Sequence, residues 1–338
     1  MKALVWTAPR VMALAEKEDP QPGPGEILIR VGFAGICGSE LNGYLGHNSL
    51  LVPPLVFGHE FAGTVAGVGP GARAGLTKGQ TVTVNPLVGC GRCEPCTTGM
   101  SNRCTSRKLI GAHFPGGYAE YVKVPAPNVV PLPAGMPIRT GAMTEPAAVG
   151  VRIGELAGPI RGEDVFVAGA GPIGLFAMQA LRLRGAARIF LSDVHPARLE
   201  MGAKLGGDIL DARDRDVVAK LREATGGRGV AAAVDAVGIE VTRRQCIQGT
   251  RTAGTVVFSG LHDEIGLVPA ADIIRREIVV RGSYCYSDAD FRQALSYLLK
   301  GEMKLDPWIE EAPLSDGGKW FARLLADPGN VSKVLLHP

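Results

Sequence analysis

Residues 165–174 read Val165-Phe166-Val167-Ala168-Gly169-Ala170-Gly171-Pro172-Ile173-Gly174. This G-x-G-x-x-G pattern lies between a predicted strand, 165–168, and a predicted helix, 172–184, which is the context in which the pattern binds a dinucleotide. Gly169 permits the tight turn, Gly171 lets a pyrophosphate approach the backbone, and Gly174 lets the helix pack on the strand. Pro172 and Ile173 open the helix, whose N-terminal N–H groups are free to bind phosphate. We therefore expect these five residues to bind the cofactor.

Asp193 follows Gly174 by 19 residues and comes directly after a second predicted strand, 189–192. A carboxylate at this place accepts hydrogen bonds from ribose hydroxyls and repels a 2′-phosphate. The pattern therefore favours NAD over NADP. The alternative is a glycine-rich turn beside a solvated aspartate.

In the second half of the chain, apolar predicted strands alternate with predicted helices. The predicted strands are 165–168, 189–192, 231–235, 255–259 and 278–281, and the predicted helices are 172–184, 196–204 and 214–225. Such alternation is typical of a doubly wound parallel sheet of the Rossmann type. We assign residues 153–286 to this NAD-binding domain.

The first part of the chain has a different pattern, in which proline and glycine interrupt short runs of residues that favour β-strands. These runs are 26–33, 60–68, 81–84 and 118–124. They predict a mostly antiparallel β unit with long loops. The tail adds a helix, 291–299, and a last strand, 331–336, that we expect to return to this unit. The predicted class is α/β, with residues 1–152 and 287–338 forming one domain around 153–286.

Composition and charge exclude several classes of protein. The 338 residues suit two domains at roughly 150 residues each, and 36 basic against 33 acidic residues leave a net charge of +3 with no basic tract. Nucleic acid is therefore not an expected partner. The N-terminal apolar run, 3–6, is too short for a signal peptide, and the uncharged run 165–181 is shorter than the ~20 residues of a membrane span. We expect a cytoplasmic protein that binds a small molecule and does not bind a membrane. We also expect it to form a homodimer or homotetramer.

Four of the seven cysteines form a compact cluster in a glycine-rich loop, the cysteine lobe, at residues 90–104. Cys90, Cys93, Cys96 and Cys104 have the spacing C-x2-C-x2-C-x7-C. Four thiolates close a tetrahedral shell around zinc and leave no position for substrate, so the pattern indicates a structural zinc. An iron–sulfur cluster or unligated thiols are the alternatives.

A second group of potential ligands indicates an open metal site. Cys37 and the pair His59-Glu60 follow separate apolar runs, and Glu145 lies where the β unit gives way to the sheet. Cysteine, imidazole and carboxylate ligands with one position left for water are typical of catalytic zinc. The alternatives are a buried thiol at Cys37, a hydrogen-bonded structural histidine at His59 and a surface carboxylate at Glu145.

Taken together, these residues resemble the zinc-containing medium-chain alcohol dehydrogenases over essentially the whole chain. Cys37 with Ser39, then His59-Glu60, the four lobe cysteines, Glu145 and the dinucleotide pattern occur in the order seen in that family. Glu60 and the Glu-Pro at 145 are similar to the polyol branch, which includes sorbitol, vicinal-diol, threonine and sugar-phosphate dehydrogenases. The resemblance implies a GroES-like catalytic domain around the Rossmann domain and two zinc ions per chain.

The resemblance also implies roles for single residues. Cys37, His59 and a glutamate, either Glu60 or Glu145, or water complete the catalytic zinc shell. Ser39 takes the proton of the alcohol while hydride passes to NAD. Further residues resemble cofactor-binding positions of the family: Arg198 near the adenosine, and Ser259, Leu261 and Ser283 on the nicotinamide side.

Two departures from the family bear on the substrate and on the proton's exit. Asn42 stands where relatives often carry a histidine, so water or His47 becomes the expected exit. The arginine that sorbitol dehydrogenases carry near residues 284–286 is missing, and residues 41–58 contain no Lys or Arg. We therefore expect oxidation of a neutral secondary alcohol, vicinal diol or sugar alcohol to the ketone. L-threonine or a phosphorylated sugar alcohol is the alternative substrate, and a zinc-free quinone or enoyl reductase is the alternative enzyme.

Overall fold

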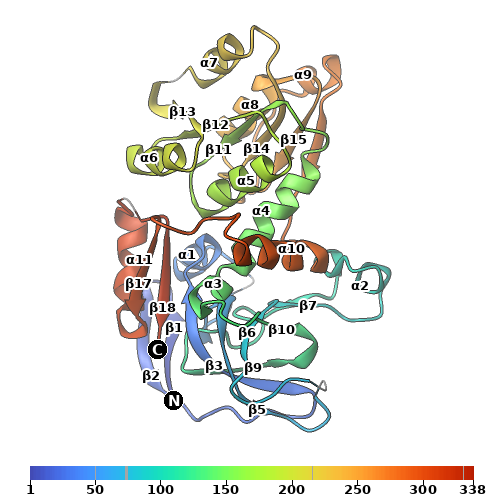
Figure 1. Cartoon of the computed structure of the whole chain (residues 1–338). Helices are drawn as coiled ribbons and strands as arrows, with labels where there is room; N and C mark the ends of the chain where they lie inside the picture. Colours follow the sequence, from blue (N-terminus) through green and yellow to red (C-terminus); the bar gives the residue numbers. More distant parts are fainter. Residues whose placement is uncertain (50, 73–74, 215, 330) are drawn as a thin grey trace. The chain divides into compact units, whose positions relative to one another are not determined.

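The computed structural model describes residues 1–338 except 50, 73–74, 215 and 330 (Figure 1). Its contacts divide into two compact units. The first comprises Met1–Glu145, Ser287–Leu299 and Trp308–Pro338, and the second Pro146–Tyr286 and Lys300–Pro307. The sequence boundary expected at 152/153 falls inside helix α4 (Thr144–Leu156), which packs in the second unit because Gly150 lies against Phe176.

The first unit is built on a seven-stranded sheet with the strand order β10-β6-β5-β3-β18-β17, and β9 also pairs with β3. The strands are β3 (Glu26–Gly35), β5 (Glu60–Val68), β6 (Thr81–Val84), β9 (Tyr121–Pro125), β10 (Val129–Pro131), β17 (Ile309–Pro313) and β18 (Lys333–His337). As expected, the last strand returns to this unit, where β18 pairs antiparallel with β3. Its other neighbour, β17, runs parallel to it.

Smaller elements complete the first unit. They are the three-stranded sheet β2 (Val11–Glu16), β1 (Lys2–Ala8) and β4 (Leu55–Val56), the pair β7 (Leu87–Val88) and β8 (Lys108–Leu109), and the helices α1 (Gly38–Tyr44), α2 (Glu94–Thr97), α3 (Ile138–Ala142), α10 (Asp288–Leu299) and α11 (Gly317–Ala326). The core holds a cluster of aromatic rings, in which Phe321 of α11 lies within 6.2 Å, centroid to centroid, of Phe57 and Tyr118. These large buried rings contribute much of the apolar area that stabilises the unit.

The second unit contains a six-stranded sheet in which every pair of neighbours is parallel, with the order β13-β12-β11-β14-β15-β16. The strands are β11 (Asp164–Ala168), β12 (Arg188–Asp193), β13 (Asp208–Asp211), β14 (Val230–Asp235), β15 (Thr250–Phe258) and β16 (Val279–Gly282), and the helices beyond α4 are α5 (Pro172–Leu183), α6 (Pro196–Lys204), α7 (Val217–Ala224), α8 (Glu240–Gly249) and α9 (Ala270–Arg275). The strand order reverses between β11 and β14. In such sheets ligands bind at the carboxyl ends of the strands beside this reversal.

Several element boundaries differ from the sequence expectation. The strand expected over 118–124 begins at Tyr121, because the chain at Ala119 makes only an isolated bridge to Ala3. The helix expected over 214–225 begins at Val217, and Arg215 lies outside the described residues. The elements that the sequence analysis did not predict include strands β1, β2, β13 and β17 and helices α1, α3, α4, α8, α9 and α11. Among the described residues, no helix is long and apolar enough to cross a membrane.

Candidate active site

Strand pairing in the first unit brings together three of the four residues expected at the open metal site. Cys37 precedes α1, and His59 precedes Glu60, the first residue of β5. Glu60 pairs with Gly35 in the register of β3 and β5. One ligand atom from each of Cys37, His59 and Glu60 lies within 4.8 Å of the others. The arrangement suits a metal ion with a mixed sulfur, nitrogen and oxygen shell.

The glycine at position 35 makes room for the carboxylate of Glu60. A Cβ atom at this position would lie 2.2 Å from Glu60 Oε2, and any side chain would therefore displace the carboxylate. The short sequence before Cys37 thus determines where the acidic side chain of the neighbouring strand lies.

A buried carboxylate that the sequence analysis missed, Glu40, holds the histidine of this cluster. Glu40 is 1% exposed, and its Oε1 atom lies 2.9 Å from His59 Nδ1. It also accepts hydrogen bonds from the N–H groups of Cys37 and Gly58 and from the hydroxyl of Tyr118, at 3.1, 2.9 and 2.5 Å. A carboxylate on one nitrogen of a histidine fixes the ring and leaves the other nitrogen for a metal.

The charges around His59 also favour binding of a cation. Burial by itself lowers the pKa of His59, but the negative charges of Glu40 and Cys37 outweigh this effect and raise the pKa well above its ordinary value. Burial likewise raises the pKa of Glu40, but His59 and the hydroxyl of Tyr118 lower it further than burial raises it. The same negative charges that favour a proton on the buried ring of His59 would favour a divalent cation beside it.

A second missed residue, Lys333, forms an ion pair with Glu60. Its Nζ atom lies 2.7 and 2.6 Å from the two carboxylate oxygens and donates a third hydrogen bond, of 2.9 Å, to the carbonyl of Ile36. The side chains of Lys333 and Glu60 are 2% and 1% exposed. No local sequence pattern marks this pair, because the partners are 273 residues apart.

The remaining residues expected here lie in different surroundings. Ser39 is exposed, and its hydroxyl donates to Cys37 Sγ at 3.3 Å. Glu145 is 7% exposed and does not belong to the three-residue cluster, although its charge acts on Lys333. Asn42 lies in α1, and its carbonyl accepts a hydrogen bond from the N–H group of the exposed residue His47.

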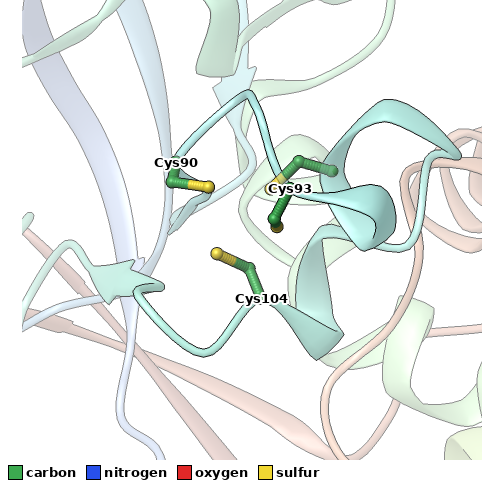
Figure 2. A group of neighbouring side chains, drawn as sticks. Cys90, Cys93 and Cys104 are labelled. Carbon is green, nitrogen blue, oxygen red and sulfur yellow. The ribbon is translucent and has the colours of Figure 1, made fainter.

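The four lobe cysteines form a second cluster, in which the sulfur atoms all lie within 4.8 Å of one another. In Figure 2 the thiols of Cys90 and Cys104 point toward one another, with Cys93 beside them. The backbone N–H groups of Arg92 and Cys93 lower the pKa of the Cys90 thiol to about 6. The loop thus stabilises a thiolate, which is the form that binds zinc.

In the second unit, the G-x-G-x-x-G turn has the geometry that its sequence predicts. Gly169 has a φ of 101°, and Gly171 is the N-cap of α5. A Cβ atom at Gly174 would lie 1.8 Å from the carbonyl oxygen of Gly169, so only glycine lets α5 begin this close to β11. Pro172 and Ile173 form the first turn of α5, whose N–H groups are available to an anion.

Asp193 lies at the end of β12 and is 8% exposed. Its carboxylate accepts hydrogen bonds from the N–H groups of Ala170 and His195 at 2.8 and 2.9 Å. The same side chain therefore ties the glycine turn to the segment that enters α6. Arg198 lies in the first turns of α6.

The residues expected on the nicotinamide side follow β15 and β16. The N–H group of Ser259 donates to the carbonyl of Asp235, and that of Ser283 to the carbonyl of Phe258. Leu261 and Ser283 line a pocket of about 670 Å³, which Ser259 does not line. Among the described residues, the buried hydroxyl of Ser283 has no hydrogen-bond partner, so it is available to a ligand.

Comparisons with known proteins identify the family of the chain. Residues 23–134 match the alcohol dehydrogenase GroES-like domain, and residues 172–300 match the zinc-binding dehydrogenase model. An L-threonine 3-dehydrogenase of Pyrococcus abyssi (strain GE5 / Orsay) is 36% identical over 316 residues, which cover 91% of this chain and 90% of that protein. The chain belongs to the zinc-binding alcohol dehydrogenase family.

Two further members of this family are similar over most of their length. The L-galactonate-5-dehydrogenase of Escherichia coli (strain K12) is 33% identical over 307 residues, which cover 90% of this chain and 89% of that protein. The crystal structure of 2R,3R-butanediol dehydrogenase from Bacillus subtilis matches with a TM-score of 0.92 and 30% identity, over 100% of this chain and 99% of that one. This alcohol dehydrogenase family member is therefore an oxidoreductase of the alcohol and polyol group, with zinc and a nicotinamide cofactor, as the sequence predicts.

The residues present in this alcohol dehydrogenase fit both zinc and a nicotinamide cofactor. The four thiols of the lobe offer the number and type of donors that a structural zinc takes, and Cys37, His59 and Glu60 offer three donors of the types that a catalytic zinc takes. The glycine turn and the first turn of α5 offer N–H groups to the cofactor's phosphates, and Asp193 offers a carboxylate to its ribose.

Proposed function

We propose that this dehydrogenase oxidises a neutral secondary alcohol, vicinal diol or sugar alcohol to the ketone, with hydride transfer to NAD. The observation that carries the proposal is the convergence of Cys37, His59 and Glu60 within 4.8 Å. A zinc-free reductase with the same fold would have no use for these three clustered ligands, so they favour the zinc-dependent reaction.

The proposed roles follow from the contacts of each residue. Cys37 and His59 would hold a zinc ion together with Glu60, Glu145 or water, and the zinc would act as a Lewis acid toward the substrate oxygen. Glu40 keeps His59 in its ligating orientation through the 2.9 Å contact. The hydroxyl of Ser39, exposed and hydrogen-bonded to Cys37 Sγ, would accept the proton of the alcohol while passing its own proton on through the nicotinamide ribose to water. Asp193 selects a cofactor whose adenosine ribose carries no 2′-phosphate.

The substrate class rests on the absence of cationic side chains from residues 41–58. A phosphate or carboxylate needs such a partner. The alternatives are L-threonine and a phosphorylated sugar alcohol, and the relatives named above favour the first of these. A panel of neutral diols, sugar alcohols, L-threonine and sugar phosphates, followed by NADH absorbance, decides among them. Turnover of charged substrates alone would refute the neutral-substrate proposal.

Replacing Asp193 with alanine is expected to lower the ratio of kcat/KM for NAD to kcat/KM for NADP. The variant loses hydrogen bonds to a charged acceptor, each worth about 1.5–3 kcal/mol, so kcat/KM for NAD should fall roughly tenfold or more. Removal of the charge also ends the repulsion of a 2′-phosphate. Asp193→Asn, which keeps one oxygen acceptor for Ala170 or His195, is the control for loop structure. Equal kcat/KM values for NAD and NADP in the unmodified protein would contradict the role of Asp193.

The absence of a histidine at position 42 is expected to affect the pH dependence of turnover. The amide of Asn42 orients water but cannot accept and release a proton. We propose water as the proton's exit, and kcat should therefore keep rising into mildly alkaline pH. Asn42→His should raise kcat at neutral pH more than at alkaline pH, whereas His47→Ala should change little. Superimposable pH profiles of all three proteins, with a full isotope effect from deuterated alcohol, would refute control of proton exit by this loop.

We also propose that the chain forms a homodimer or homotetramer. Strand β16 is at the edge of the parallel sheet, and all four of its residues are exposed, including Val279 and Val280 at 44% and 38%. Exposed apolar edge strands tend to pair with another chain. Light scattering that gives the mass of a single chain would contradict this proposal.

A further inference from the structure

Lys333 is a fully buried cation beside the proposed metal site. The proposed function gives it no role. It is the first residue of β18, which lies beside β3 in the sheet. Its ammonium contacts both oxygens of Glu60, at 2.7 and 2.6 Å, and the carbonyl of Ile36, at 2.9 Å. Lysine is almost never fully buried without a partner, so this position is built around the ion pair.

The ammonium stays charged in these surroundings. Its Nζ atom lies within hydrogen-bond distance of three acceptors, the two oxygens of Glu60 and the carbonyl of Ile36, which match the three donors of an ammonium group. A permanent positive charge therefore lies beside the same carboxylate that a metal at Cys37 and His59 would attract.

Glu60 thus has two potential cationic partners, one built into the chain and one bound. An isolated buried carboxylate without a partner is strongly unfavourable, and it would bind the nearest cation firmly. Lys333 removes this need, because it satisfies both oxygens of Glu60 without the metal. The carboxylate still has lone pairs for a ligand bond.

We propose that Lys333 is a positioning residue that keeps Glu60 an exchangeable ligand of the metal, so that the last position of the shell remains open to substrate or water. The inference rests on the proposed metal site of Cys37, His59 and Glu60. It assigns Lys333 a role in opening the shell rather than in holding the sheet together.

The test compares Lys333→Met with Lys333→Arg, Glu60→Gln and the double variant Lys333→Met/Glu60→Gln. Methionine keeps a long apolar side chain and removes the charge, whereas arginine keeps the charge. Lys319→Met removes an exposed lysine of the same unit, 83% exposed, and is the control for loss of surface charge. Each protein is loaded with zinc alone, and the zinc released to a chelator is followed by metal analysis, together with KM and kcat for the alcohol.

The expected result is that Lys333→Met releases the zinc of this site on the order of tenfold more slowly, a typical size for changes beside metal ligands. KM for the alcohol should rise, since Glu60 now occupies the position that the substrate needs. Lys333→Arg should restore both values. In the Glu60→Gln background the change at Lys333 should have no effect on zinc release, because no carboxylate is left to bind the metal.

Faster zinc release from Lys333→Met, or the same effect in the Glu60→Gln background, would overturn the inference and leave the proposed function intact. Failure of the unmodified protein to bind zinc at Cys37 and His59 would instead overturn the proposed function. If Lys333→Met does not accumulate as folded protein, Lys333→Gln keeps a hydrogen-bond donor without the charge. Slower zinc release is expected from it as well, and faster release refutes the inference.

Discussion

Replacing His59 with alanine is expected to lower kcat by at least about a thousandfold, because a metal acting on the substrate oxygen contributes several kcal/mol and each 1.36 kcal/mol is a factor of ten. Stability should change much less. Glu40 loses its contact with His59 but keeps three other hydrogen-bond donors, the N–H groups of Cys37 and Gly58 and the hydroxyl of Tyr118. The measurements are NADH absorbance, zinc content and the melting temperature.

Zinc content separates loss of the open site from loss of the fold. The unmodified protein should approach two zinc ions per chain, one for each cluster, and His59→Ala should keep the one in the four-cysteine lobe. His47→Ala, a change to an exposed histidine, is the control for substituting this residue type. An active His59→Ala variant, or at most one zinc in carefully prepared unmodified protein, would contradict the assignment.

Replacing Cys93 with serine is expected to have the opposite pattern, with a large loss of stability and a retained open site. A structural zinc contributes about 10 kcal/mol of apparent binding energy in small zinc domains. Only part of this reaches the global transition, since the loop around α2 can unfold locally. At roughly 2–4 °C per kcal/mol for a domain of this size, a net loss of a few kcal/mol lowers Tm on the order of 10 °C.

The control for this change is Cys285→Ser, because Cys285 belongs to neither cluster. It should leave Tm nearly unchanged and both zinc ions in place. Cys93→Ser should lose one zinc ion while the other stays at Cys37 and His59. A Cys93→Ser variant with normal zinc content and unchanged Tm would exclude a structural metal in the lobe.

The sequence by itself determined the parts of this protein whose geometry depends on near neighbours in the chain. The turn at Gly169 and the start of α5 at Pro172 follow from a spacing of a few residues. Gly169 has a positive φ, and at Gly174 the local backbone leaves no room for a side chain. The lobe belongs to the same class, because its four thiols span only 15 residues, from Cys90 to Cys104. Alternation of apolar strands and helices likewise predicted the parallel sheet.

Only the tertiary structure decided which partner each buried charge meets. Glu40 reaches Tyr118 across 78 residues of sequence, and Lys333 reaches Glu60 across 273. Their positions depend on the pairing of β18, β3 and β5, which arises from the packing of the whole sheet. The convergence of Cys37 with Glu60 has the same cause, and a ligand list from the sequence therefore lacked the two residues that hold those ligands in place. A buried charge selects its partner through the fold that surrounds it, since only the folded chain removes the water that would otherwise solvate it.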